Sequence, residues 1–317
     1  MSRFETLYPL WIVGAVLLGL ASGIIDSVRA VANSSIYPLL VFMLFFTFLH
    51  IPFTRIRKSF SNRMFTWTSL AINFVWTPLL AYGLASLFLP NEPALWIGLI
   101  MLLVTPCTDW YLLFTGIAKG DVATSFSVLP LNLLLQLALL PIYVSVLTGA
   151  SHSIPMSVLF ESLVVLLIPL LFAFGIRTIL IRIRRDTWIE RTSHWPVLLL
   201  LFAIGAMFAA NGQLLIQNLS LLGLLIVPLS LFFCINFFVS RLVGRMNHMP
   251  NEQVISLQMT TLARNSPVAL TVAIAAFPNE PLIALVLIVG PLLELPVLVL
   301  TSSLIRRMSS NQAVKES

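Results

Sequence analysis

The run Thr105-Pro106-Cys107-Thr108-Asp109 places a thiol and a carboxylate inside an otherwise apolar segment. Proline has no N–H to donate and its ring clashes with the preceding helical turn, so a helix is expected to break here. The carbonyl oxygens that the break releases need partners inside the protein, because lipid offers none. Threonine hydroxyls can supply them, and a proline kink would explain Pro106 alone. It would not explain Asp109, since a carboxylate at this depth is costly. Our hypothesis is that Asp109 takes up and releases a proton, in a proton-coupling role.

A second run, Arg264-Asn265-Ser266-Pro267, repeats this arrangement with a basic group. A guanidinium in a polar cavity suits an anion, because its planar fork of N–H donors matches the oxygens of an oxyanion. A half-helix that begins near Pro267 would also point its partly positive N-terminus at this place. The alternative is a structural ion pair between Asp109 and Arg264 that joins two helices, and the two interpretations are compatible.

Four further polar residues lie inside apolar segments. Asn132 and Gln136 are four residues apart, so they share one face of a helix. Glu294 is the only carboxylate deep in the last apolar segment. Its functional interpretation is a proton carrier, and its structural interpretation is a hydrogen bond between helices. Thr260 lies one helical turn before Arg264 and is a supporting polar residue.

These residues require long apolar helices to hold them, and the composition supplies such helices. Of the 317 residues, 59% are hydrophobic and only 9% are charged, whereas a soluble domain has about 25% charged residues. The sequence therefore predicts an all-α membrane protein embedded in the lipid bilayer. With about 20 apolar residues per span, we expect ten transmembrane helices. They are 8–25, 34–53, 64–89, 95–117, 124–147, 156–176, 195–210, 219–240, 254–276 and 281–303.

The basic residues predict the orientation of these spans. If the N-terminus is cytoplasmic, all of the 18 lysines and arginines except Arg29 and Arg264 fall on the cytoplasmic side. This bias is the positive-inside signal of multi-pass proteins, and it predicts that both termini are cytoplasmic. Short loops and the lack of targeting extensions indicate a prokaryotic plasma membrane. The net charge of +6 does not indicate nucleic acid, because the basic residues lie in short loops between spans.

Ten spans can divide into two groups of five. The chain would then be one transporter domain, residues 1–317, with one repeat at 1–150 and another at 151–317. Because five is odd, the second repeat would be inverted relative to the first, and span four would match span nine. Each of these two spans carries a break, at Pro106 and at Pro267. Paired broken helices in inverted repeats mark the binding site of many secondary transporters, so we expect helices four and nine to cross there.

Several other functions are disfavoured by the sequence. It contains no GxxxxGK[ST] loop for binding nucleotide phosphates. The four histidines have no metal-ligand companion at helical spacing, and the two cysteines show no zinc spacing. We therefore expect a transporter and not an enzyme, without a cofactor or a resident metal, and the oligomeric state is left open. A receptor or scaffold is disfavoured because no long polar segment could form a separate soluble domain.

Two parts of the sequence resemble a known family. TPCTDWYLLFTGIAKGD followed by LPLNLLLQLALLPIYVSVL, and VALTVAIAAF followed by ALVLIVGPLLELPVLVL, resemble the arsenite efflux permeases of the bile acid:sodium symporter superfamily. The resemblance covers most of the chain. It implies that spans four and nine are unwound and cross at the binding site. It also implies that Cys107 matches a cysteine essential for arsenite transport, and that Glu294 matches a glutamate of the last span.

The ninth span departs from the pattern of this family. Arsenite permeases carry an asparagine-aromatic-glutamate run, whereas this chain reads NSPV from Asn265. Sodium-coupled members use a glutamate and a glutamine as sodium ligands at positions similar to Thr260 and Arg264. A fixed guanidinium near a sodium site would oppose the ion, so we expect coupling to protons or no coupling.

The predicted function is therefore secondary active transport. The first hypothesis is proton-coupled efflux of arsenite, in which Cys107 gives the metalloid one soft ligand and binding stays weak enough for release. The alternative is transport of an organic anion, such as a bile acid or a small carboxylate, with Arg264 as its partner. The candidate substrate-binding residues are Cys107, Thr105, Thr108, Arg264, Asn265 and Ser266.

Overall fold

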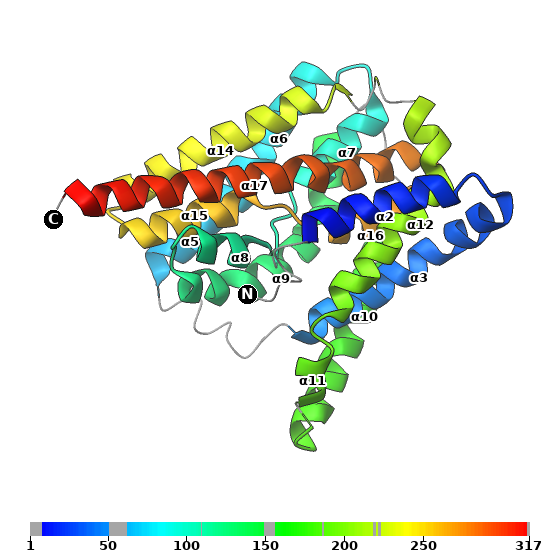
Figure 1. Ribbon diagram of the computed structural model, residues 1–317, viewed down its shortest axis with the longest axis horizontal. Helices are drawn as coiled ribbons and strands as arrows, with labels where there is room; N and C mark the ends of the chain where they lie inside the picture. The colour runs from blue at the N-terminus through cyan, green and yellow to red at the C-terminus, as the bar shows by residue number, and fades with distance from the viewer. Residues whose placement is uncertain are drawn as a thin grey trace.

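The computed structural model describes residues 8–50, 62–108, 110–148, 156–185, 187–217, 220 and 223–315. Within these residues the chain is helical, with one isolated β-bridge and no strand. Figure 1 shows the long helices packed into one bundle, with α17 running across it. The all-α class expected from composition is confirmed.

The described helices, in chain order, divide between the two halves of the chain. In the N-terminal half they are α2 (Tyr8–Ser22), α3 (Asp26–His50), α5 (Arg63–Ala71), the π-helix η2 (Ile72–Trp76), α6 (Thr77–Phe88), α7 (Pro93–Leu103), α8 (Trp110–Ile117) and α9 (Val122–Thr148). In the C-terminal half they are α10 (Met156–Arg182), α11 (Thr187–Arg191), α12 (Trp195–Gln217), α14 (Ile226–Met246), α15 (Asn251–Leu262), α16 (Ser266–Ala276) and α17 (Pro281–Lys315).

Six of the described helical segments are long and apolar enough to cross a membrane. They are Asp26–His50, Arg63–Phe88, Val122–Leu147, Thr187–Gln213, Ile226–Met246 and Pro281–Arg306. Shorter apolar helices follow the same pattern at Val13–Ser22, Pro93–Leu103 and Ser266–Ala276. The chain is thus a multi-pass membrane protein. The count of ten spans and the inverted repeat stay predictions.

Some predicted span ends were wrong. The expected spans 34–53, 195–210 and 281–303 are shorter than α3, α12 and α17, the helices that cover most of them. Hydropathy marks only the apolar part of a helix, whereas the helical backbone continues through polar residues with good helix propensity. Helix α17, for example, continues past 303 through residues that include neither proline nor glycine.

The helices form two groups that meet along the broken segments. Helices α2, α3, α10 and α12 pack together in one part of the bundle, and α5, α6, α14 and α15 lie in the other (Figure 1). Between them α16 packs against α3, α10 and α17, while α17 packs against α7 and α8. The ends of the half-helices α7, α8, α15 and α16 therefore lie inside the bundle, where lipid does not reach.

The segment α5–η2–α6 contains a π-turn that proline explains. Pro78 has no N–H for the carbonyl of Phe74, four residues earlier, so the regular ladder cannot continue through this turn. The hydroxyl of Tyr143 on α9 donates to that carbonyl instead. This hydrogen bond joins α9 to the π-turn, beside Asn73.

Replacing Tyr143 by Phe should lower the free energy of unfolding by about 1 kcal/mol, because the carbonyl of Phe74 loses its donor. Unfolding of the purified protein in detergent measures this change. Tyr82→Phe is the matched control: Tyr82 is 47% exposed and packs edge-to-face on Trp96, a contact that phenylalanine keeps. Equal destabilisation by both substitutions would contradict the assigned role of Tyr143.

Candidate functional site

Two interrupted helices cross in the middle of the bundle. Helix α7 stops before α8 begins, and α15 stops before α16 begins. Between the two breaks, the amide of Cys107 donates to the carbonyl of Ala263 at 3.0 Å, and the amide of Asn265 donates to the carbonyl of Thr105 at 2.7 Å. These bonds form an antiparallel bridge between Pro106 and Arg264. Four half-helix ends therefore meet at one point.

The sequence explains both breaks locally. Pro106 has no N–H, which is tolerated in a bridge where its neighbours make the hydrogen bonds. In the second break Ala263 is extended, with φ −72° and ψ 136°. The side chain of Asn265 caps α16 by accepting from the amide of Val268 at 3.4 Å, and Pro267 lies in the first turn, where no donor is needed. Both predicted helix-breaking prolines lie at the crossing.

Hydroxyl and amide groups surround the bridge. Cys107 is 3% exposed. The hydroxyl of Thr108 accepts from the side-chain amide of Asn265 at 3.4 Å, which connects the two breaks through their side chains. The hydroxyl of Thr105 donates to two carbonyls of the last turn of α7, the role expected for a threonine beside a helix break. Ser266 is also buried. The structure thus brings the predicted substrate-binding residues to one crossing.

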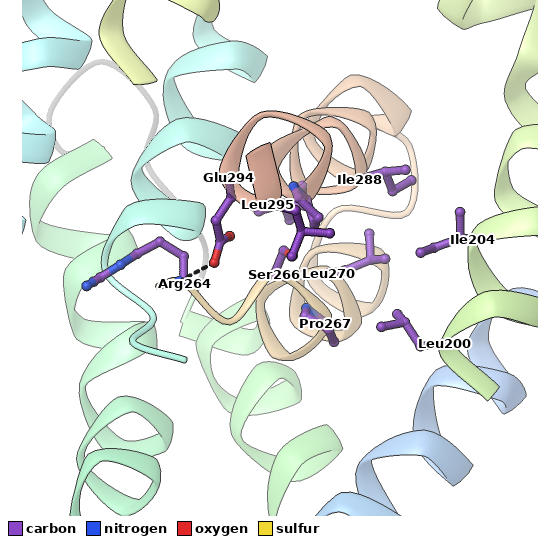
Figure 2. Close-up of a pocket in the computed structure, with 11 residues that line it drawn as sticks. Leu200, Ile204, Arg264, Ser266, Pro267, Leu270, Ile288, Glu294 and Leu295 are labelled. Atoms are coloured by element: carbon purple, nitrogen blue, oxygen red, sulfur yellow. Dashed lines mark hydrogen bonds between the residues drawn. The ribbon is translucent and has the colours of Figure 1, made fainter. Parts of the chain in front are cut away.

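Glu294 on α17 contacts the second break directly. Its Oε1 accepts a hydrogen bond from the backbone amide of Arg264 at 2.8 Å, the dashed line in Figure 2. Glu294 is 3% exposed. With Ser266 it lines a cavity of about 30 Å³ between α12, α16 and α17, and most of the other lining residues are apolar. A cavity of this size is large enough for one water molecule.

The guanidinium of Arg264 points away from this cavity (Figure 2). One nitrogen, Nη1, donates to the carbonyl of Leu103 at 2.9 Å. The other, Nη2, donates to the side-chain oxygen of Asn73 at 3.1 Å and to the carbonyl of Thr261. Nε lies 3.4 Å from the carbonyl of Leu262. Oxygens of the protein therefore hold Arg264 on several sides.

These contacts place the positive charge of Arg264 at the C-terminal ends of two half-helices. Leu103 is the last residue of α7 and Leu262 is the last residue of α15. Such ends carry partial negative charge and unpaired carbonyls, and a cation satisfies both. Asp109, the predicted partner of Arg264 and a predicted proton-coupling residue, lies outside the described residues. Within the described part of the chain Arg264 makes no ion pair.

Two amide side chains on α9 are buried without partners. Asn132 is 0% and Gln136 is 1% exposed, and among the described residues none of their side-chain nitrogen or oxygen atoms has a hydrogen bond. Tyr143 lies two helical turns after Gln136 on the same face, and its hydrogen bond to Phe74 turns that face toward the π-turn. Asn132 and Gln136 therefore face the interior, and they lie on one face of α9.

A second polar stripe lies on the helix opposite. Ser69, Asn73 and Thr77 are spaced four residues apart on α5–η2–α6, and each is 0% exposed. The Ser69 and Thr77 hydroxyls and the Asn73 Nδ2 also lack partners among the described residues. Buried polar groups are nearly always satisfied by protein or by ordered water. The region between α9 and this helix therefore suits water or a polar ligand.

The sequence interpretation missed Asn73 and its two neighbours. The available signal was the spacing of four between polar residues in the span 64–89, together with Pro78 as a mark of a distorted helix. Thr260 is buried, and its hydroxyl donates to the carbonyl of Ser256 within α15 at 2.8 Å.

Comparisons with known proteins agree with this architecture. Residues 37–218 match the family described as Sodium Bile acid symporter family. The chain is 26% identical to the arsenical-resistance protein Acr3 of Corynebacterium glutamicum, over 94% of this chain and 88% of that protein. It is 23% identical to the arsenical-resistance protein Acr3 of Alkaliphilus metalliredigens, over 93% and 90%. It is 22% identical to the uncharacterized transporter slr0944 of Synechocystis, over 95% and 88%.

Proposed function

This chain belongs to the Sodium Bile acid symporter family of membrane transporters, and on that premise we propose that it exports arsenite through the crossing of its two broken helices, in exchange for protons. Two of the proteins it resembles are named arsenical-resistance proteins, which supports the choice of substrate. The observation that carries the proposal is the position of Cys107 in the bridge between the breaks, beside Thr108 and Asn265.

The chemistry of trivalent arsenic suits this site. Arsenic is a soft centre that prefers sulfur, so the thiol of Cys107 can replace one hydroxyl of the substrate. An As–S bond forms, an As–O bond breaks, and the hydroxyl leaves as water with the thiol proton. A single sulfur ligand holds the metalloid weakly enough to release it, which transport requires. The hydroxyl of Thr108 and the amide of Asn265 can bind the remaining oxygens.

Glu294 is the proposed proton carrier. It is buried on α17 and its carboxylate accepts the amide of Arg264 in the second break. A change in its protonation therefore acts directly on the backbone of the crossing, because a proton on that oxygen competes with the amide donor. This contact supports a coupling between proton binding and the shape of the site.

The organic-anion alternative has less support. It depended on Arg264 as the partner of a carboxylate. The guanidinium instead binds carbonyls of Leu103 and Thr261 and the side chain of Asn73, and it points away from the cavity at Glu294. An anion would have to displace these oxygens to reach it.

We also infer that ten spans form two inverted repeats, with both termini in the cytoplasm of a prokaryotic cell. The pairing of Pro106 with Arg264, each in the break of its own helix pair, is what a two-fold axis between repeats would produce. The distribution of lysine and arginine supports the orientation. A green fluorescent protein fused after Ser317 should fluoresce in bacteria. A full-length fusion that does not fluoresce would place the C-terminus outside the cytoplasm and contradict this orientation.

Arsenite accumulation in arsenite-sensitive bacteria tests the proposed function. Cells that express the chain should retain less arsenite than cells with an empty vector and should grow at higher arsenite concentrations. Antimonite, a second thiophilic metalloid, is the related substrate to include. Unchanged accumulation of both, with the protein detected in the membrane, would overturn the proposal.

A further inference from the structure

Four oxygen atoms and an aromatic ring surround the guanidinium of Arg264. The oxygens are the backbone carbonyls of Leu103, Thr261 and Leu262 and the side-chain oxygen of Asn73. The ring centroid of Phe232 lies 5.3 Å from the guanidinium carbon, within the range of a cation–π contact. We call these five residues the oxygen cage. It is built from residues of α7, α15, η2 and α14, which are distant in the sequence.

The charges of this cage balance one cation. The C-terminal end of a helix carries about half a unit of negative charge, and the ends of both α7 and α15 point at the guanidinium. Within the described residues no carboxylate forms an ion pair with Arg264. Neutral oxygens and two helix ends contact the guanidinium itself, while the carboxylate of Glu294 accepts the backbone amide of the same residue and adds negative charge nearby. The same arrangement, without the arginine, would attract a small mobile cation.

Carbonyls at the C-terminal ends of half-helices are where many transporters bind Na⁺ or a proton. Here the cage is already filled by a side chain that is 2% exposed. A second cation beside it would meet strong repulsion, because charges interact more strongly away from water. We propose that Arg264 is a tethered cation that takes the place of a mobile coupling ion at the helix crossing, so that this transporter does not use Na⁺ there.

This proposal goes beyond arsenite export and does not depend on it. Without the guanidinium, the cage oxygens lose their donors and the two helix ends lose their compensating charge. A ligand that binds only the folded state raises the free energy of unfolding by RT ln(1 + L/Kd), where L is the free ligand concentration and Kd its dissociation constant. The stability of the Arg264→Ala variant should therefore depend on the Na⁺ concentration. The stability of the natural chain should not depend on it. No substrate is needed to observe this difference.

The test is thermal unfolding of the purified full-length protein in detergent, with Na⁺ replaced stepwise by N-methyl-D-glucamine at constant chloride. The unmodified chain should melt at one temperature throughout. Arg264→Ala should melt lower without Na⁺ and should regain several degrees as Na⁺ is added, with a rise that becomes logarithmic in the Na⁺ concentration above the dissociation constant. Arg264→Lys keeps a tethered charge and should stay indifferent to Na⁺.

Arg177→Ala is the matched control for loss of an arginine. Arg177 also donates to a backbone carbonyl, that of Leu49, but it has no oxygen cage among the described residues. Its variant should show no response to Na⁺. The proposal is overturned if Na⁺ stabilises the unmodified chain, if Arg264→Ala folds and ignores Na⁺, or if Arg264→Ala fails to fold at every Na⁺ concentration.

Discussion

Cys107→Ser should abolish arsenite resistance and bring cellular arsenite to the level of cells without the transporter. Serine keeps the backbone amide that donates to Ala263, so the bridge between the broken helices should persist. It replaces a soft sulfur ligand by a hard hydroxyl, which trivalent arsenic prefers far less. We expect efflux to fall roughly tenfold or more, equivalent to at least about 1.4 kcal/mol of lost binding. The rate of efflux from arsenite-loaded cells measures this loss.

The chain provides its own matched control for this substitution. Its other cysteine, Cys234, is exposed on α14 and lies outside the crossing. Cys234→Ser should leave arsenite efflux unchanged. Membrane levels of both variants should equal those of the unmodified chain. Full resistance with Cys107→Ser at equal expression would remove the thiol from the mechanism.

Glu294→Gln should uncouple transport from protons while leaving the fold intact. The side-chain oxygen of glutamine can still accept the amide of Arg264, so the contact between α17 and the second break is preserved. The amide group cannot take up or release a proton. Arsenite flux should therefore stop responding to an imposed pH gradient, and efflux should fall roughly a hundredfold or more, as expected for loss of a positioned proton-transfer group.

The control for Glu294 is another glutamate at the start of α17. Glu280 is exposed and precedes the first residue of the helix. Glu280→Gln should transport arsenite with an unchanged response to pH. If Glu294→Gln keeps its pH response, the proton carrier is another group, and a structural hydrogen bond is then the whole role of Glu294.

The two helix breaks could be predicted from the sequence because a proline lies at each of them. Pro106 and Pro267 remove backbone donors, and the polar residues beside them show that the released carbonyls are not facing lipid. The depth of Glu294 in its apolar segment also indicated a buried carboxyl, and Glu294 is buried in the structure. Which residues pair across the two breaks could not be predicted from the sequence. The pairing of Cys107 with Ala263 depends on how two distant helix pairs pack, and neither residue signals it.

The environment of Arg264 shows the limit of the sequence most clearly. A buried guanidinium could be recognised, and an anionic ligand was the natural partner to infer. Its observed partners are mainly backbone carbonyls, which every residue has and which therefore leave no mark in a sequence. The one side-chain oxygen among them, that of Asn73, is 191 residues away. Only the structure shows that the guanidinium charge compensates the partial negative charge at the C-terminal ends of α7 and α15.

Arsenite flux into proteoliposomes that contain only the purified chain tests the central claim most directly. An imposed proton gradient should drive arsenite in the direction opposite to proton flow, faster than in protein-free liposomes, and Cys107→Ser should reduce the flux to the protein-free rate. Flux equal to that of protein-free liposomes, with the protein folded and inserted, would contradict the account.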